Sequence, residues 1–316
     1  MGELVHVWNR CHGCDAAPIV GTRYECDVCP AGPDNDLCAA CHARFLEGKL
    51  AHPLIASREA VAGTHTFRAI AGTPRADAAP WLAVPWAPAR APAVPERSVV
   101  RPEFRSGRDS WLGSYGFVVA AEDGGRPVLI TALHVLDELI RARGVDATAG
   151  NAGYTGRELP PRLSDVQLYD VFAANWMLAG LGLAGEMFVL PRARIPAVEP
   201  FSDTDIAAFR VRANASVQTL RLAAAAPPAG APVWLAARGR ATERTTPAVV
   251  VEASARTLVV RLAPGVTMPP YGSGSPLLNS AGEAVGILSG GGMLDGQQLG
   301  HACHVGSVRQ HLGWGA

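Results

Sequence analysis

Short runs of apolar and β-branched residues recur from about residue 99 to the end of the chain, with Gly or Pro close to most of them. This pattern predicts β-strands joined by turns, as in a β-barrel. Two of the runs are separated by Asp-Gly-Gly, which predicts a hairpin. Helices are expected at 134–144 and 305–313. The predicted strands are SYGFVVAAE, RPVLITALHV, VQLYDVFA, EMFVLPRARI, TDIAAFRV, APVWLAAR, TPAVVVEAS, TLVVRLAP, AVGILSG and LGHACHV.

The pattern changes twice toward the N-terminus. Residues 1–70 are rich in Cys and His, whereas residues 71–98 alternate Pro with Ala. The second composition favours an extended, polyproline-like connector. Within it, Trp81 and Trp86 are too apolar for a solvated tether, so we expect them to dock on a domain surface. The predicted organisation is a small N-terminal domain (1–70), a linker (71–98) and a mainly β domain (99–316).

Composition narrows the class of protein. Hydrophobic residues make up 48% of the chain, enough for a real core. Lys plus Arg and Asp plus Glu both number 28, so the formal net charge is zero and no nucleic-acid partner is expected. The start lacks a secretion signal, and the longest apolar stretch, AANWMLAGLGLAG, is too short for a membrane span. These features favour a cytoplasmic protein with no membrane partner.

The first 70 residues contain three Cys-X-X-Cys pairs. A two-residue gap lets both sulfurs of a pair face one metal ion, so each pair supplies half of a tetrahedral zinc site. In a reducing compartment such pairs hold metal rather than form disulfides. Together with two histidines they predict two structural Zn²⁺ ions, with the ligands Cys11, Cys14, Cys26, Cys29, Cys38, Cys41, His52 and His65.

Residues 5–70 also resemble a ZZ-type zinc finger. The resemblance rests on Arg23-Tyr24 before the third cysteine, on DNDL before the fifth, and on the ending GTHTFRAI. It implies two cross-braced sites, the second completed by two histidines. The first site would comprise Cys11, Cys14, Cys38 and Cys41, and the second Cys26 and Cys29 with the histidines. A long insert separates His52 from His65, unlike the family pattern, and His42 is the alternative to His52.

Many ZZ-type fingers bind the free N-terminal amine of a peptide, so the resemblance implies such a partner. Carboxylates attract an ammonium group, which makes Asp15, Asp34 and Asp36 the candidate ligands. His12 stands where the family carries its first acidic residue. The alternative is that Asp34 and Asp36 only support the loop that carries the zinc ligands.

Three short segments of the β region carry the groups that serine-nucleophile catalysis needs. A serine hydroxyl needs a base to remove its proton, and the base needs an acid to orient it. ITALHV places His134 at the end of an apolar strand, and DTDIAAF places Asp205 before another, with Asp203 as an alternative. YGSGSPL surrounds Ser273 with small residues, which permits a tight turn whose N–H groups form an oxyanion site. This series predicts a hydrolase of peptide bonds.

The same segments resemble the trypsin-like (chymotrypsin-fold) serine proteases over about residues 100–316. Their motifs T-A-x-H-V, D-I-A and G-x-S-G-[GS]-P match those around His134, Asp205 and Ser273. The resemblance implies a double β-barrel, with His134 as general base, Asp205 as its orienting acid and Ser273 as nucleophile. The oxyanion site would comprise Tyr271, Gly272 and Ser273. The family has glycine at the position of Tyr271, where a bulky side chain limits backbone freedom.

The resemblance also implies where a substrate lies. The strand edge formed by Ser289, Gly290 and Gly291 would pair with the substrate backbone. Thr267 takes the position of the pocket floor, and its lack of charge implies a small or medium apolar residue before the cleaved bond. A late strand carries His301, Cys303 and His304, which we expect beside the pocket rather than around a metal.

The sequence therefore favours an intracellular serine endopeptidase whose finger recruits a protein substrate or partner. The intact series of His134, Asp205 and Ser273 supports an enzyme, because a decayed enzyme usually loses one of the three. Tyr271 supports the alternative, a weak or inactive protease-like scaffold that binds proteins. A third possibility is a finger that only caps and inhibits the protease.

Overall fold

The structure is a computed structural model of the 316-residue chain. No helix of the described parts is long and apolar enough to cross a membrane. These parts are residues 3–26, 36–50, 65–87, 89–122, 124–136, 165–188, 205–238, 243–269 and 271–314.

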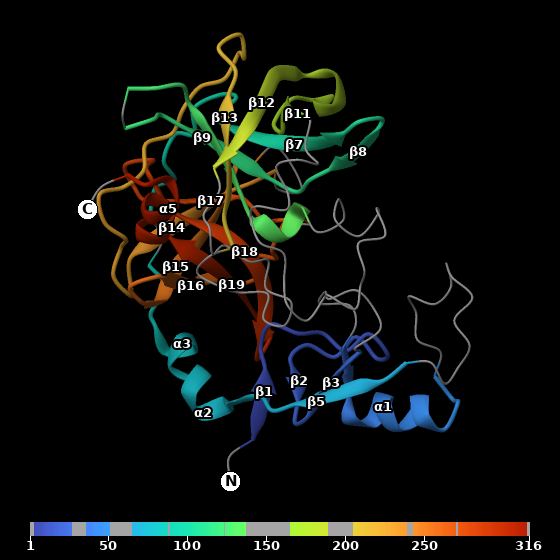
Figure 1. Cartoon of the computed structure of the whole chain (residues 1–316). Coiled ribbons are helices and arrows are strands. Elements are labelled where there is room, and N and C mark those ends of the chain that lie inside the picture. The colour runs from blue at the N-terminus through green and yellow to red at the C-terminus, as the bar shows by residue number, and fades with distance from the viewer. Residues whose placement is uncertain are drawn as a thin grey trace.

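The first β-barrel occupies the upper part of Figure 1. Its antiparallel strands close into a ring through the pairing of β7 with β11, and β8 (Asp109–Leu112) is attached to β7. In order around the ring, the strands are β11 (Asp165–Asp170), β12 (Gly180–Phe188), β13 (Ala207–Val211), β10 (Val128–Thr131), β9 (Gly116–Val119) and β7 (Val99–Ser106).

The second barrel follows in the C-terminal half and is closed as well. Helix α5 (Val305–Leu312) packs against its strands β18 and β19 at the end of the chain (Figure 1). Around the barrel, the strands are β14 (Pro232–Ala236), β15 (Thr245–Ala253), β16 (Thr257–Leu262), β19 (Gln297–His304), β18 (Ala284–Leu294) and β17 (Pro276–Leu278).

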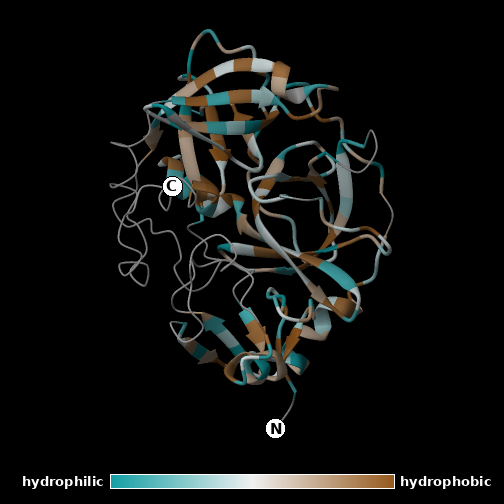
Figure 2. Cartoon of the chain, turned by 90° about the vertical axis from the view of Figure 1, so that its right-hand side faces the viewer, coloured by the Kyte–Doolittle hydropathy of each residue, from teal (hydrophilic) through white to brown (hydrophobic). Residues whose placement is uncertain are grey.

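Burial explains why the strands are so uniformly apolar. Every residue of β9 and β10 is buried, because Val118 and Leu129 face the interior of the first barrel while Phe117 and Ile130 face the core shared with the second. The outer strands, which are solvated on one face, show brown and teal in alternation at the top of Figure 2. The mainly β fold with two closed barrels and a C-terminal helix is therefore confirmed.

Some local predictions need correction. The pattern did not mark β7, β8 or β17, since charged residues and Pro102 interrupt the first two and β17 is only three residues long. Strand β12 begins at Gly180, six residues before the predicted run, and residues 189–204 lie outside the described part. Of the helix expected at 134–144, the structure describes a 3-10 turn, η2 (Leu133–Leu136). A second such turn, η5 (Trp176–Leu178), precedes β12.

In the described residues before the connector's own helices, the structure has two small sheets and one helix. The first sheet has the strand order β2 (Ile19–Val20), β1 (Leu4–His6) and β6 (Thr73–Pro74). The second sheet has the order β4 (Asp36–Cys38), β3 (Arg23–Cys26) and β5 (Phe67–Ile70), and α1 (Ala39–Leu46) follows β4 directly.

The connector is only partly extended, contrary to the prediction for residues 71–98. Helices α2 (Arg75–Ala78) and α3 (Pro80–Ala83) form where alanines lie between the prolines. Arg261 of the second barrel donates hydrogen bonds to the carbonyls of Trp81, Leu82 and Val84, at 2.8 Å for Trp81. Trp81 and Trp86 pack against valines of β15 and β16, so both tryptophans dock on a domain surface as expected.

Candidate active site

Asp205 holds His134 in one orientation. The carboxylate is fully buried and accepts a hydrogen bond from the backbone N–H of His134 at 2.8 Å. Its second oxygen lies 2.7 Å from His134 Nδ1. The His134 side chain itself is 32% exposed. Asp203, the alternative acid, lies outside the described residues.

The turn that carries Ser273 is fastened to the first barrel through Tyr115. The backbone N–H of Tyr115 donates to the Ser273 carbonyl at 3.0 Å, and Thr131 Oγ1 donates to the Tyr115 carbonyl at 2.6 Å. Thr131 ends β10 three residues before His134. Tyr115 therefore connects the turn of the second barrel to the strand that leads into the His134 turn.

Gly274 is required for this close approach. Its φ is +84°, and a Cβ atom there would lie 2.0 Å from the Tyr115 carbonyl oxygen and 2.7 Å from Thr131 Oγ1. No L-residue side chain fits such a gap, so the small residues around Ser273 allow contact between the barrels as well as a tight turn.

A chain of polar contacts links Ser273 to the strands beneath it. Ser273 Oγ donates to the Ser289 carbonyl at 3.2 Å. Ser289 Oγ lies 3.5 Å from Cys303 Sγ, which in turn lies 3.8 Å from the carbonyl oxygen of Asp205. Strands β18 and β19 thus support both the serine turn and the acid, and Cys303 is a buried structural group.

Tyr271 adopts the backbone conformation that glycine favours. Its φ is +57°, in the left-handed region that costs a non-glycine residue about 1 to 2 kcal/mol. The ring is 74% exposed, and the Arg101 guanidinium lies 5.9 Å from its centroid. The chain therefore keeps a glycine-like backbone at this position despite the tyrosine. Gly272 is confined, since a Cβ there would lie 3.1 Å from Leu288 Cδ2.

Beside the serine turn, Met268 occupies the space that side chains on Gly272, Gly291 and Gly300 would otherwise need, and this space is called the recess below. Gly291 and Gly300 face each other across β18 and β19, and Cβ atoms on them would lie 3.4 and 3.1 Å from the Met268 methyl carbon. A Cβ on Gly272, the residue before Ser273, would lie 3.6 Å from Met268 Cγ. Thr267, the predicted pocket floor, is exposed, whereas its neighbour occupies the recess.

The histidines of β19 have other partners than a metal ion. His301 packs edge-on against Trp8 at 5.7 Å, and burial lowers its pKa to about 4 although the Asp205 charge acts to raise it. His304 Nδ1 accepts from the Gly306 N–H at 2.7 Å and so caps α5. Among the described residues, the cluster of side chains that could hold a metal ion lies elsewhere.

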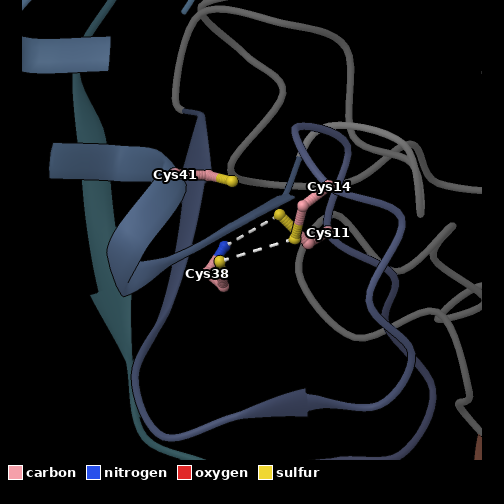
Figure 3. A group of neighbouring side chains, drawn as sticks. All are labelled: Cys11, Cys14, Cys38 and Cys41. Atoms are coloured by element: carbon pink, nitrogen blue, oxygen red, sulfur yellow. Dashed lines mark hydrogen bonds between the residues drawn. The ribbon is translucent and has the colours of Figure 1, made fainter. Parts of the chain in front are cut away.

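That cluster consists of four cysteine sulfurs in the N-terminal region (Figure 3). They lie within 4.8 Å of one another, and the Sγ atoms of Cys14 and Cys38 are 3.9 Å apart. Four sulfurs at about 2.3 Å from a zinc ion would lie about 3.8 Å apart, so the cluster matches a tetrahedral zinc site. The Cys38 N–H also donates to Cys11 Sγ, a contact typical of zinc-bound thiolates. The members are Cys11, Cys14, Cys38 and Cys41.

Part of the second predicted ligand set is also brought together. Cys26 Sγ lies 3.2 Å from His65 Nδ1, although the two residues are 39 positions apart. Cys29 and His52 lie outside the described residues. His42, the alternative to His52, stacks on Tyr24 at 3.9 Å and 10° and meets Phe67 edge-on.

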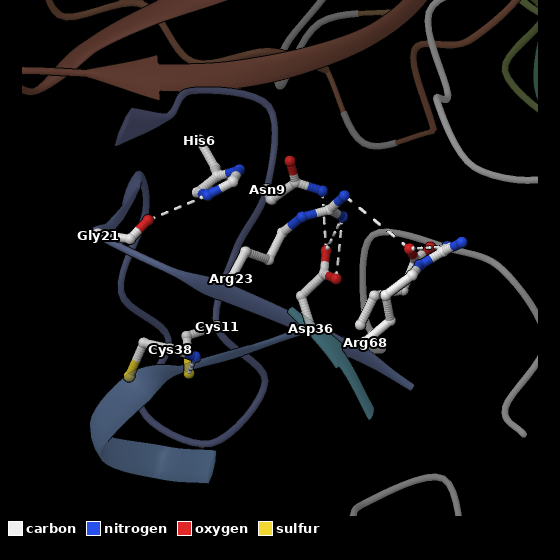
Figure 4. Close-up of polar contacts among 9 residues, drawn as sticks. His6, Asn9, Cys11, Gly21, Arg23, Asp36, Cys38 and Arg68 are labelled. Carbon is white, nitrogen blue, oxygen red and sulfur yellow. Dashed lines mark hydrogen bonds and ion pairs between the residues drawn. The ribbon is translucent and has the colours of Figure 1, made fainter. Parts of the chain in front are cut away.

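Asp36 is buried rather than open to a ligand, and Figure 4 shows it in contact with Arg23 and Asn9. It is 1% exposed, and both of its carboxylate oxygens accept from Arg23 at 3.0 Å, with Asn9 donating at 2.8 Å. Burial raises its pKa to about 6, against the opposing charge of Arg23. Asp36 therefore supports the loop, which was the alternative role. Asp15 is exposed and pairs with Arg10 at 2.9 Å, and Asp34 lies outside the described residues.

Sequence reasoning missed Tyr115, Thr131 and Met268. Tyr115 contacts the Ser273 turn through its backbone, and Thr131 binds the Tyr115 carbonyl. Single contacts of this kind produce no repeating pattern in the sequence. Met268 directly follows the predicted pocket-floor position, so a comparison of neighbouring side-chain volumes was the signal that could have found it.

Two family models match this chain. One, described as a trypsin-like peptidase domain, matches residues 113–287, and the other, a ZZ-type zinc finger, matches residues 6–49. The active form of the Rv3671c protease from M. tuberculosis is 19% identical, with a TM-score of 0.42 over 73% of this chain and 93% of that one. The crystal structure of Deg5 is 15% identical, with a TM-score of 0.41 over 68% and 87%. The first family match spans more than half of the chain and includes His134, Asp205 and Ser273.

Proposed function

Because the chain belongs to the trypsin-like peptidase domain family and carries a ZZ-type zinc finger, we propose that it is a serine endopeptidase. His134 is the general base, Asp205 its orienting acid and Ser273 the nucleophile. The observation that carries this proposal is the buried Asp205 carboxylate, which binds both the backbone and the Nδ1 of His134. The carboxylate fixes the orientation of the ring and lies beside the positive charge that forms on the imidazole during the reaction.

The reaction follows from these roles. The Ser273 hydroxyl turns from the Ser289 carbonyl toward His134, transfers its proton to Nε2 and attacks the substrate carbonyl carbon. Backbone N–H groups of the turn from Tyr271 to Ser273 stabilise the oxyanion that forms. His134 then returns the proton to the departing amine and leaves an acyl ester on Ser273. His134 then takes a proton from water, which attacks the ester carbonyl. As the bond to Ser273 Oγ breaks, His134 returns that proton to the oxygen, so the acid product leaves and both residues are restored.

Met268 sets the selectivity for the residue before the cleaved bond. A substrate carbonyl at Ser273 directs that residue's side chain toward the recess between Gly291 and Gly300. Since the Met268 methyl group already contacts both glycine positions, only a small side chain such as Ala enters without moving it. Met is flexible, so slightly larger apolar side chains are accepted with lower efficiency.

The finger is proposed to hold two zinc ions, which supply structure rather than catalysis. One is held by the cluster of Figure 3, and the other by Cys26 and His65 with Cys29 and His52. Because paired cysteines hold metal rather than form disulfides where the surroundings are reducing, we also propose a cytoplasmic location. The domain division at residues 70 and 98 is part of the same proposal.

The finger is further proposed to recruit a protein substrate or partner by its free N-terminus. Asp15 is exposed and negatively charged, and Asp34 precedes the same zinc site in sequence. A peptide with a free amine is expected to bind better than its acetylated form. Equal binding of the two would refute this role.

One observation favours the alternative of a weak or inactive scaffold. Tyr271 adopts a φ that is unfavourable for a residue other than glycine, and its exposed side chain lies beside the proposed oxyanion site. Hydrolysis of an unfolded protein substrate separates the two functions. Wild-type chain should cleave it, whereas Ser273→Ala and His134→Ala should lose at least about a thousandfold in rate. Equal background rates for all three chains would support the scaffold.

A further inference from the structure

Within the described part of the chain, the edge of strand β18 beside Ser273 is only partly paired. Strand β17 pairs with β18 as far as Ile287, and Leu288 exchanges backbone hydrogen bonds with Gly274 and Ser275. Further along, the Ser289 carbonyl points to Ser273 Oγ, and the Met293 N–H points to the Val7 carbonyl at 3.0 Å. Alternate residues of a strand present their backbone groups to the same edge, so Gly291 faces this edge as well.

The Val7 carbonyl, which accepts from the Met293 N–H, belongs to a turn of the finger. Asn9 N–H donates to the His6 carbonyl at 3.2 Å, so Val7 and Trp8 form the tip of a turn that starts at the end of β1. In Figure 1 the blue start of the chain meets the lower end of the red hairpin of β18 and β19. The finger therefore touches the same strand edge that runs past the proposed nucleophile.

This contact is tight and well buried. Val7 is 4% exposed, and a Cβ on Gly292 would lie 2.3 Å from its carbonyl oxygen. The Trp8 ring packs against Trp81 and His301, at centroid distances of 5.9 and 5.7 Å. Such a contact cannot be shared with a second peptide strand.

We propose that the turn of Val7 and Trp8 ends the substrate-binding edge, so that four extended residues before the cleaved bond are bound. This inference rests on the proposed function. Numbering back from the cleaved bond, the first residue pairs at Ser289 and the third at Gly291. The fifth would pair at Met293, where the Val7 carbonyl already accepts the N–H. The ligand is thus a short extended peptide that either begins at its fourth residue or bends away there.

The test uses a series of peptides that share one cleavage site and differ in length, with one to six residues before the cleaved bond. Each is assayed with the full-length, zinc-loaded chain. The value of kcat/KM should rise up to four residues and stay level or fall at five and six. Trp8→Ala removes the ring that packs on Trp81 and His301, and so loosens the turn that carries the Val7 carbonyl. A fifth substrate residue can then displace this carbonyl from the Met293 N–H. In that variant the fifth residue should raise kcat/KM by about fivefold, the effect of one hydrogen bond.

Trp111→Ala is the matched control, because Trp111 lies on β8 of the first barrel, and it should keep the wild-type profile. Affinities of the same peptides for the Ser273→Ala chain give a readout that needs no turnover. One outcome is that affinity stops rising at four residues while wild type hydrolyses none of the peptides. That result refutes the proposed function and supports the inference that the Val7 turn ends the binding edge. Hydrolysis or binding that improves steadily through six residues overturns the inference.

Discussion

Replacing Met268 by Ala should open the recess beside Ser273 to larger side chains. The methionine side chain reaches from Gly272 to the facing pair Gly291 and Gly300, and its methyl carbon is 3.1 Å from the Cβ position on Gly300. Met268→Ala removes three heavy atoms from this space. A leucine side chain has three carbon atoms more than alanine, so it is the substrate side chain whose size matches the space gained.

The size of the effect follows from burial. At about 0.8 kcal/mol for each buried methylene, three carbons are worth about 2.4 kcal/mol in the transition state. This corresponds to about 50-fold in kcat/KM for Leu relative to Ala before the cleaved bond. Wild type should prefer Ala, and Met268→Ala should reverse or level that preference. The assay is hydrolysis of fluorogenic peptides that differ only at this residue, carrying Ala, Val, Leu or Phe.

Met187→Ala provides the control. Met187 is also partly buried, but it packs in the first barrel, so this variant should lose stability without changing selectivity. An active, folded Met268→Ala chain with the wild-type order of substrates would refute the proposed recess. Wild type that cuts best after Phe would refute it as well.

Three further predictions concern stability and metal content. Gly274→Ala should lower the free energy of unfolding by about 2 to 4 kcal/mol in a urea titration, because the added methyl group meets the Tyr115 carbonyl. The control Gly230→Ala has a similar φ of +87° but open space around it, so it should lower the same free energy by about 1 kcal/mol. Burial lowers the pKa of His311 from 6.5 to about 4, so the folded state binds fewer protons and stability should fall as the pH drops from 6.5 to 4. This residue contributes up to about 3 kcal/mol, and His311→Leu should reduce that acid loss in titrations at both pH values. Purified wild type should contain two zinc ions and Cys26→Ala one, by elemental analysis; one ion in wild type contradicts the ligand assignment.

Part of the β region could be predicted because strands such as β9 and β10 are buried on both faces. Their sequences GFVV and VLIT contain a single polar side chain, that of Thr131, because a strand between two cores needs no solvated face. His134 and Asp205 were detectable since each stands at the end of such a run, where backbone geometry fixes a side chain. The cysteine pairs were detectable because metal ligation demands a fixed spacing.

The rest depends on contacts between distant segments. The Val7 turn contacts Met293 through backbone atoms, so no pattern of side chains predicts this contact. Arg261 holds α3 and the residue after it against the second barrel by binding three carbonyls, and neither partner indicates the other in sequence. Met268 fills a recess made by glycines that lie far along the chain, so its role depends on the register of β18 and β19.

The central claim is that Ser273 is an activated nucleophile, and a fluorophosphonate probe tests it most directly. The probe forms a phosphonyl ester with a serine whose proton is taken by a neighbouring base. We predict a single adduct on Ser273 by peptide mass spectrometry in wild type. The adduct should be lost in His134→Ala and strongly slowed in Asp205→Asn, which disturbs the orientation of the imidazole. A folded, zinc-loaded wild-type chain without an adduct on Ser273 would contradict the account.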